Sequence, residues 1–169
     1  PWMEEARRRL LLARSGRVRP HLDDKILTSW NALMISAFAK GAQVLAQEPY
    51  LKAATRAAQF IRNHMWKEGK LFRRFREGEA SVDGFLDDYA FLALAMLDLY
   101  EAGFHTEDLR FAVVLAETIM ERFEDAESGG FYSTEAGAED LVLRMKEDYD
   151  GAEPSGNSVA TLLLQRLAG

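Results

Sequence analysis

The sequence predicts an all-α fold built from helical hairpins, arranged as part of an α/α toroid. The first observation is that helices apolar on almost every side alternate with helices apolar along a single stripe, which indicates an inner layer covered by an outer one. The second is a repeat: Trp30 precedes Tyr89 by 59 residues, and Phe60 precedes Ile119 by the same interval. A repeat of this length indicates a recurring supersecondary unit. Six hairpins would need about twice this length, so we expect a partial six-hairpin barrel.

The first third of the chain predicts two helices joined by a polar connector. The segment Trp2–Arg14 alternates apolar residues with arginines and is typical of an amphipathic helix, which Gly16 would end. After the connector, Thr28 or Ser29 is a plausible N-cap for an inner helix. Its apolar residues recur at helical spacing on more than one face. It should end before Pro49, because a residue that precedes proline is disfavoured in a helix.

The next hairpin repeats this order. Residues Tyr50–Trp66 carry one apolar stripe, as expected of an outer helix, and Gly69 ends it. Residues 70–81 alternate weakly and predict a short β-hairpin. A second inner helix then follows over Asp83–Tyr100, with acidic residues in its first turn and an apolar body.

A third hairpin begins in the same way. The stripe of Leu109–Phe123 predicts another outer helix, and Gly129 with the following FYST marks a second short extended excursion. A long polar connector, Glu135–Pro154, leads to Ser155, a plausible N-cap for the last helix. The outer-to-inner connectors are therefore long and the inner-to-outer turns short. Long connectors on a rigid scaffold usually carry binding residues, so we expect a site at their end of the toroid.

Composition excludes several classes of function. A net charge of −6 and a pI near 5.2 argue against a nucleic-acid partner. The absence of cysteine excludes disulfides and thiolate sites. No apolar run is long enough to span a membrane, and no signal peptide is evident, so cytoplasmic is the default location. Histidine and glutamate pairs at helical spacing are missing, so we expect no metal and no cofactor.

The ends of the chain suggest a fragment. It begins at Pro1 without a methionine and stops at Gly169 directly after an apolar helical run. We therefore expect residues 1–169 to be a single partial-toroid domain of a longer protein. A partial toroid should expose apolar surface at its open edge, which predicts self-association or marginal stability.

Polar and aromatic residues cluster just before or just inside each inner helix, at the end with the long connectors. Helix N-termini there favour anions and polar ligands. The predicted substrate-binding residues are His21, Asp23, Lys25, Trp30, Asn31, Asp83, Tyr89, Asp150, Ser155 and Asn157. Trp30 and Tyr89 would stack on the apolar face of a sugar ring.

The predicted catalytic residues are Asp87, Asp88 and Asp24. Acids in a first helical turn also complement the helix dipole, so a purely structural role is the alternative. As catalysts they would divide acid and base roles, as paired carboxylates do in glycosidases. Epimerisation would instead need histidines as proton carriers. Among the histidines of this chain, His21 is expected at the end with the long connectors and His105 at the opposite end.

Four blocks of the chain occur in the order in which a known protein family has them: HLDDKILTSWNALMISAFAK, DGFLDDYAFLALAMLDLYEA, FYST and RMKEDYDGAEPSGNSVA. Through these blocks the chain resembles the C-terminal region of the spermatogenesis-associated, thioredoxin-domain-containing proteins. The resemblance implies an α/α toroid related to six-hairpin glycosidases and N-acylglucosamine 2-epimerases. It also implies a thioredoxin-like domain, which this chain does not contain. One departure is that residues 134–144 contain no histidine.

These observations predict part of a carbohydrate-active protein, similar to glycoside hydrolases, that uses carboxylates at this end of the toroid. Two alternatives remain open. One is a sugar epimerase or isomerase, and the other is a non-catalytic toroid that binds a ligand or partner.

Overall fold

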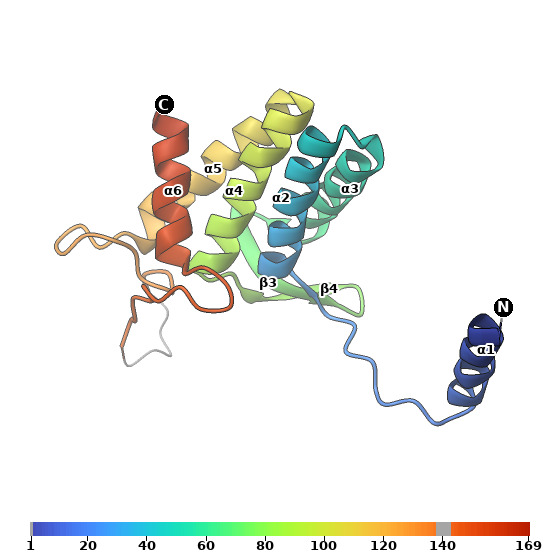
Figure 1. Ribbon diagram of the computed structural model, residues 1–169. Coiled ribbons are helices and arrows are strands. Elements are labelled where there is room, and N and C mark those ends of the chain that lie inside the picture. The colour runs from blue at the N-terminus through green and yellow to red at the C-terminus, as the bar shows by residue number, and fades with distance from the viewer. Residues whose placement is uncertain (1, 138–142) are drawn as a thin grey trace.

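The computed structural model describes residues 2–137 and 143–169 (Figure 1). Three helices form an inner layer: α2 (Thr28–Leu45), α4 (Leu86–Gly103) and α6 (Gly156–Ala168). Helix α4 lies in the middle and packs against both α2 and α6. Residues 138–142, within the predicted polar connector, lie outside the described part of the chain.

Two further helices form the outer layer. Helix α3 (Glu48–His64) packs against α2, and α5 (Thr106–Phe123) packs against α4. In Figure 1 both lie behind the inner helices. The predicted order of inner and outer helices is therefore confirmed. Helix α1 (Trp2–Ser15) also forms as predicted, but it stands apart at the end of an extended connector and buries none of its residues.

The body of α4 explains why it lies at the centre. Its apolar residues surround the helix, and nearly all are buried, because neighbouring helices cover several sides at once. The helix begins later than predicted, at Leu86 rather than Asp83. Asp83 instead ends a strand, and Phe85 occupies the N-cap position.

The short strands form a sheet beneath the inner helices. They are β1 (Ile26–Leu27), β2 (Trp66–Lys67), β3 (Lys70–Arg76) and β4 (Glu79–Asp83). Strand β3 pairs antiparallel with each of the others, and its register with β4 places Arg74 opposite Ser81.

The predicted hairpin is confirmed, and its turn residues have the backbone that a tight hairpin requires. Glu77 and Gly78, between β3 and β4, both have positive φ, at 53° and 84°. The second predicted excursion is smaller, since Phe131 forms only an isolated bridge with Glu124.

Gly84 joins the sheet to α4. Its N–H donates to the carbonyl of Leu71 at 2.7 Å, and a Cβ at this position would lie 2.9 Å from that oxygen. Only glycine allows this close approach. The chain can therefore pass directly from β4 into α4.

Of the predicted helix N-caps, the one for α6 is confirmed and the one for α2 is wrong. Ser155 does cap α6, since its hydroxyl accepts from the N–H of Ser158 at 3.1 Å. Neither Thr28 nor Ser29 caps α2, because Leu27 occupies the N-cap position. The hydroxyl of Thr28 is buried and donates instead to the carbonyl of Phe72 at 2.6 Å, which fastens α2 to β3.

One face of α2 has no covering helix among the described residues. The side chains of Trp30, Met34 and Val44 are exposed along it. This agrees with the expected apolar edge of a partial toroid, whereas the expected self-association stays a prediction.

Candidate functional site

The inner helices begin at the same end of the molecule, close to the β-hairpin (Figure 1). This end, referred to here as the rim, also receives the long connectors that precede α4 and α6. The rim is therefore the part of the fold on which the predicted site residues converge.

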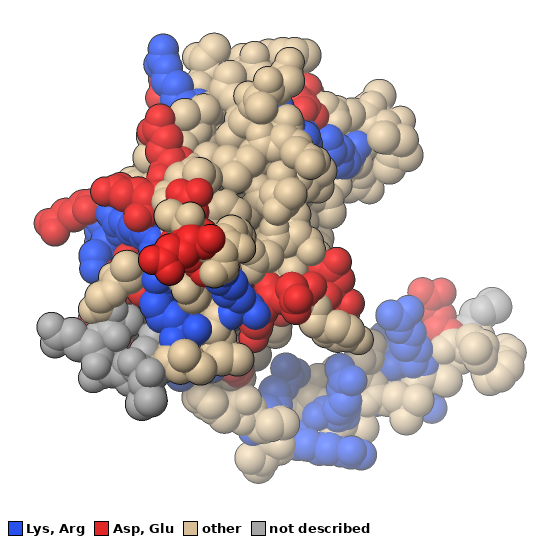
Figure 2. Space-filling model, turned by 90° about the vertical axis from the view of Figure 1, so that its left-hand side faces the viewer, with Lys and Arg blue, Asp and Glu red and all other residues tan. Residues whose placement is uncertain are grey.

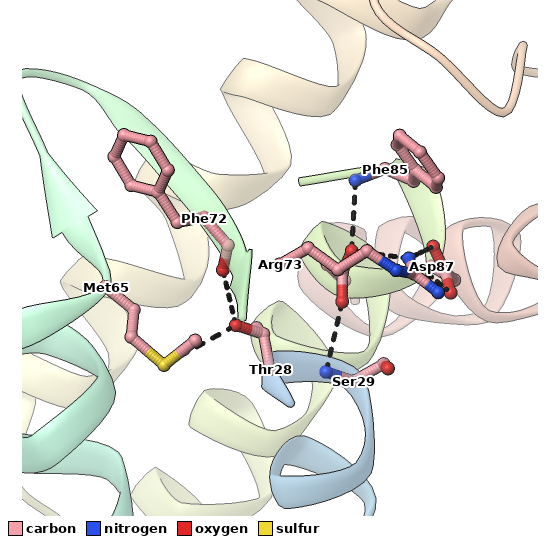
Figure 3. A network of polar contacts seen from close by, with 8 residues as sticks. Thr28, Ser29, Met65, Phe72, Arg73, Phe85 and Asp87 are labelled. Atoms are coloured by element: carbon pink, nitrogen blue, oxygen red, sulfur yellow. Dashed lines mark hydrogen bonds and ion pairs between the residues drawn. The ribbon is translucent and has the colours of Figure 1, made fainter. Parts of the chain in front are cut away.

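Asp88 lies in the first turn of α4 and is fully buried. Its Oδ2 accepts hydrogen bonds from the N–H of Phe85 at 3.0 Å and from Arg73 Nη1 at 2.8 Å. Its Oδ1 accepts from the N–H of Ser29 at 3.1 Å (Figure 3). One carboxylate thus joins α4, α2 and β3.

The environment of Asp88 changes its ionisation. Burial, and to a smaller extent the charge of Asp87, raise its pKa to about 6, while Arg73 acts in the opposite direction. Because no part of this side chain reaches solvent, the predicted catalytic role for Asp88 does not fit its position. The structural alternative does fit, because each of its hydrogen bonds holds a backbone or an arginine of the rim.

Asp87 occupies a different environment although it is the adjacent residue. Its side chain is 28% exposed, and Arg73 Nη1 donates to both of its oxygens, at 3.1 and 3.2 Å. The start of α6 approaches closely, because a Cβ on Gly156 would lie 3.1 Å from the Asp87 nitrogen. Of the two neighbouring acids, Asp87 is therefore the one that a ligand can reach.

A hollow of about 500 Å³ opens at the rim beside the start of α2. Its wall includes Trp30, which is 61% exposed, and Tyr149, which is 83% exposed. Gly151, Ala152 and Glu153 complete the lining. Our sequence interpretation missed Tyr149 and Glu153, since they fall in a connector identified only as polar. The signal that could have identified this wall is the aromatic residue Tyr149 within an otherwise polar segment.

Asp24 does not join this group. Its Oδ1 lies 2.8 Å from Arg76 Nε, and Arg76 also contacts the His21 ring at 3.2 Å. Arg76 and Arg73 are three positions apart on β3, so their side chains point to opposite faces of the strand. Asp24 and the two acids of α4, predicted together as catalytic residues, therefore contact arginines on opposite faces of β3.

Two other residues of the same connector also lie away from the hollow. Asp23 forms an exposed ion pair with Lys25, at 2.7 Å. Together with His21 and Asp24, they belong to the segment that leads from α1 to β1.

Tyr89 is a further correction. Its side chain is only 2% exposed, and its ring packs against Phe123 with centroids 5.2 Å apart. Its hydroxyl accepts from the buried N–H of Leu71 at 2.9 Å. The ring is thus part of the core and cannot stack on a sugar.

Two more predicted binding residues have local partners at the rim. The Asn31 amide donates to the carbonyl of Leu27 at 2.8 Å, within the start of α2. Asp83 is exposed on β4 and lies 3.6 Å from Lys70 Nζ.

The remaining predicted residues order the connector that carries Tyr149. Asp150 accepts from the N–H of Ser155 at 2.8 Å, and this bond holds its pKa below the ordinary value. The Asn157 amide donates to the carbonyls of Phe131 and Glu147, at 2.8 and 2.9 Å. These residues support the wall of the hollow.

Charges on the folded body alternate in sign. Figure 2 shows acidic and basic side chains side by side in the lower part of one face, whereas the upper part is mostly uncharged. Within residues 2–137 and 143–169, no group of histidine and acidic side chains is placed to hold a metal ion. In the same residues, no helix has the length and apolar character needed to cross a bilayer.

Comparison with known sequences gives close relatives over almost the whole chain. Human spermatogenesis-associated protein 20 is 42% identical over 173 residues, which covers 95% of this chain and 22% of that protein. This confirms the resemblance to the spermatogenesis-associated proteins. An uncharacterised protein of Caenorhabditis elegans is 37% identical, covering 98% of this chain and 24% of its own length. The chain thus spans about a quarter or less of these relatives. No protein-family model matches it.

Solved structures show the same architecture at low identity. Cellobiose 2-epimerase from Bacillus thermoamylovorans aligns with a TM-score of 0.67 at 19% identity, covering 86% of this chain and 39% of the enzyme. A family 76 glycoside hydrolase, a mannosidase of Bacteroides thetaiotaomicron, aligns at 0.65 and 15% identity, covering 89% and 42%. These likenesses confirm the fold class as that of α/α-toroid enzymes.

Proposed function

We propose that the rim of this chain is part of a carbohydrate-active site, similar to those of glycoside hydrolases. The observation that carries the proposal is that one accessible carboxylate, Asp87, shares the rim with a hollow lined by two exposed aromatic rings. Trp30 and Tyr149 are the aromatic residues. Exposed aromatic side chains of this size usually mark a binding surface when they gather at a concave site.

The chemistry of the lining suits a sugar. Aromatic rings offer an apolar face to the C–H groups of a pyranose, and carboxylates accept hydrogen bonds from its hydroxyls. Asp87 would supply one carboxylate of the reaction, and Glu153, which lines the hollow, is a candidate for the second acidic group. Most glycoside hydrolases use two carboxyl groups, one of which donates a proton.

The proposal is tested by measuring sugar turnover and sugar binding of the complete natural polypeptide. The probes are a panel of aryl glycosides, for hydrolysis, and a panel of reducing sugars, for epimerisation. We expect Asp87→Asn to lower turnover by about 100-fold or more and Trp30→Ala to weaken binding. Glu79→Gln, which changes an exposed acid on β4, is the matched control and should leave both quantities unchanged.

The outcomes separate the candidate functions. Hydrolysis of a glycoside that depends on Asp87 supports the proposal, and interconversion of reducing sugars assigns the epimerase alternative. Binding that requires Trp30 without turnover assigns a non-catalytic sugar site. Absence of both binding and turnover across the panels would overturn the proposal.

A further inference from the structure

Arg73 is the cation that joins the two adjacent carboxylates at the rim. It projects from β3, and its Nη1 lies 3.1 and 3.2 Å from the oxygens of Asp87 and 2.8 Å from Asp88 Oδ2. The guanidinium also lies over the Phe85 ring, 4.7 Å from the centroid. Figure 3 shows these groups together at the start of α4.

This geometry restricts the side chain of Arg73. The Phe85 ring supports the plane of the guanidinium, and charge-assisted hydrogen bonds from Nη1 hold one of its nitrogens. Asp88, in turn, is held by the backbones of Phe85 and Ser29. The orientation of Asp87 is therefore set by an arginine that is anchored on a buried and immobile carboxylate.

The charge balance also depends on this one residue. Asp87 and Asp88 are neighbouring acids, and two close carboxylates resist being ionised together. Arg73 is the only basic side chain paired with either of them among the described residues. The backbone of Asp87 lies against the start of α6, since a Cβ on Gly156 would lie 3.1 Å from the Asp87 nitrogen.

We infer that Arg73 is a positioning residue, which holds Asp87 as an oriented carboxylate so that Asp87 acts as a base or anionic stabiliser. The proton donor of the reaction must then be a different group. This inference rests on the proposed function, because it assigns a role within the same site. It extends that proposal, since a residue that the sequence did not single out decides how Asp87 works.

A purely structural role for Arg73, through Asp88 alone, is the competing explanation. The two roles differ in what they change. Loss of a structural contact lowers the fraction of folded protein, whereas loss of a positioning contact lowers kcat of the folded protein with little change in KM. A misplacement of about 1 Å can cost roughly 100-fold in rate.

The variants are chosen to separate these effects. Arg73→Gln removes the cation, and Arg73→Lys keeps the charge without the planar fork. The double variant Arg73→Gln with Asp88→Asn also removes the buried charge, so that no unpaired carboxylate is left to unfold the rim. Arg74→Gln is the matched control, because its side chain lies on the opposite face of the same strand.

The readouts are kcat and KM of the complete polypeptide, on the panel substrate that the wild type turns over. We expect the folded double variant to lose about 100-fold in kcat with a small change in KM. We also expect Arg73→Lys to restore part of the rate. Arg74→Gln should match the wild type.

An unchanged kcat in a folded double variant would overturn the inference while leaving the proposed function intact. A wild type without turnover or binding on any panel sugar would overturn the proposed function, and this inference with it.

Discussion

The carboxylate of Asp88 accepts a hydrogen bond from the backbone N–H of Ser29 at 3.1 Å, across the starts of two inner helices. The two residues are 59 positions apart, which is the interval of the internal repeat. Equivalent positions of successive hairpins are thus in direct contact. The repeat therefore builds its own connection between adjacent inner helices.

Replacement of Asp88 should destabilise the fold. Asp88→Ala leaves the buried N–H of Ser29 and the partly buried N–H of Phe85 without their acceptor, and it leaves Arg73 with Asp87 alone. We expect this to cost about 2–4 kcal/mol in the free energy of unfolding. Urea denaturation followed by circular dichroism measures it. Glu117→Ala, on the exposed face of α5, is the control and should change stability by no more than about 0.5 kcal/mol. A similar small effect for Asp88→Ala would contradict the assigned role.

The same residue predicts a dependence of stability on pH. Its folded pKa, about 6, lies above the ordinary value of 3.8, so the folded state binds the proton more tightly. The stability from this group is fully present below pH 3.8 and is lost as pH rises through about 6. Its loss should be on the order of 1–3 kcal/mol. Denaturation of wild type and Asp88→Asn at pH 4, 5, 6 and 7 isolates this contribution. The same dependence of the unfolding free energy on pH in both proteins would disprove the prediction.

A second buried acid holds the far end of the inner layer together. Asp98, on α4, accepts from Ser36 and Lys40 of α2 and from Arg166 of α6. Asp98→Ala should cost about 2–4 kcal/mol, because Ser36 loses its acceptor and Lys40 and Arg166 keep only Glu101 as a partner. We also expect faster hydrogen exchange in α6. Glu101→Gln changes the exposed neighbour in the same cluster and should cost at most about 1 kcal/mol.

Trp30 and Tyr89, both predicted from the sequence to stack on a sugar, should respond differently to substitution. Tyr89→Phe removes the acceptor of a buried N–H and should cost about 1–3 kcal/mol without affecting sugar binding. Trp30→Ala should leave the unfolding free energy within about 0.5 kcal/mol and weaken binding. Denaturation measures the free energy of unfolding, and titration with the panel sugar that the wild type binds measures the affinity. The opposite pattern would place Tyr89 at the site.

The uncovered face of α2 predicts association that depends on protein concentration. Met34 and Val44 are exposed along it, and burial of apolar area drives association. Light scattering of this chain should show oligomers that dissociate on dilution. Met34→Asp should favour the monomer, whereas Val18→Asp, on the connector after α1, should not. A monodisperse monomer at every concentration would contradict the prediction.

The helices, their layers and the hairpin between Lys70 and Asp83 could be predicted, because periodicity and turn residues act locally. The position of the rim could be predicted from the lengths of the connectors. The contact partners of its residues could not be predicted, because they come from segments that are distant in the sequence. Arg73 was not singled out because β3 contains three arginines, and the sequence does not show which of them contacts the acids of α4. Asp24 was grouped with Asp87 because sequence alone does not show the opposite faces of β3.

The sequence by itself determined that this protein is built of repeated helical hairpins and that two adjacent acids begin its central helix. The tertiary structure decided which acid is buried. A helix that is apolar on almost every side has no outward face in its sequence pattern, so its neighbours alone determine which side chains reach solvent. Here Ser29, Phe85 and Arg73 enclose Asp88, and Asp87 is left partly exposed at the rim.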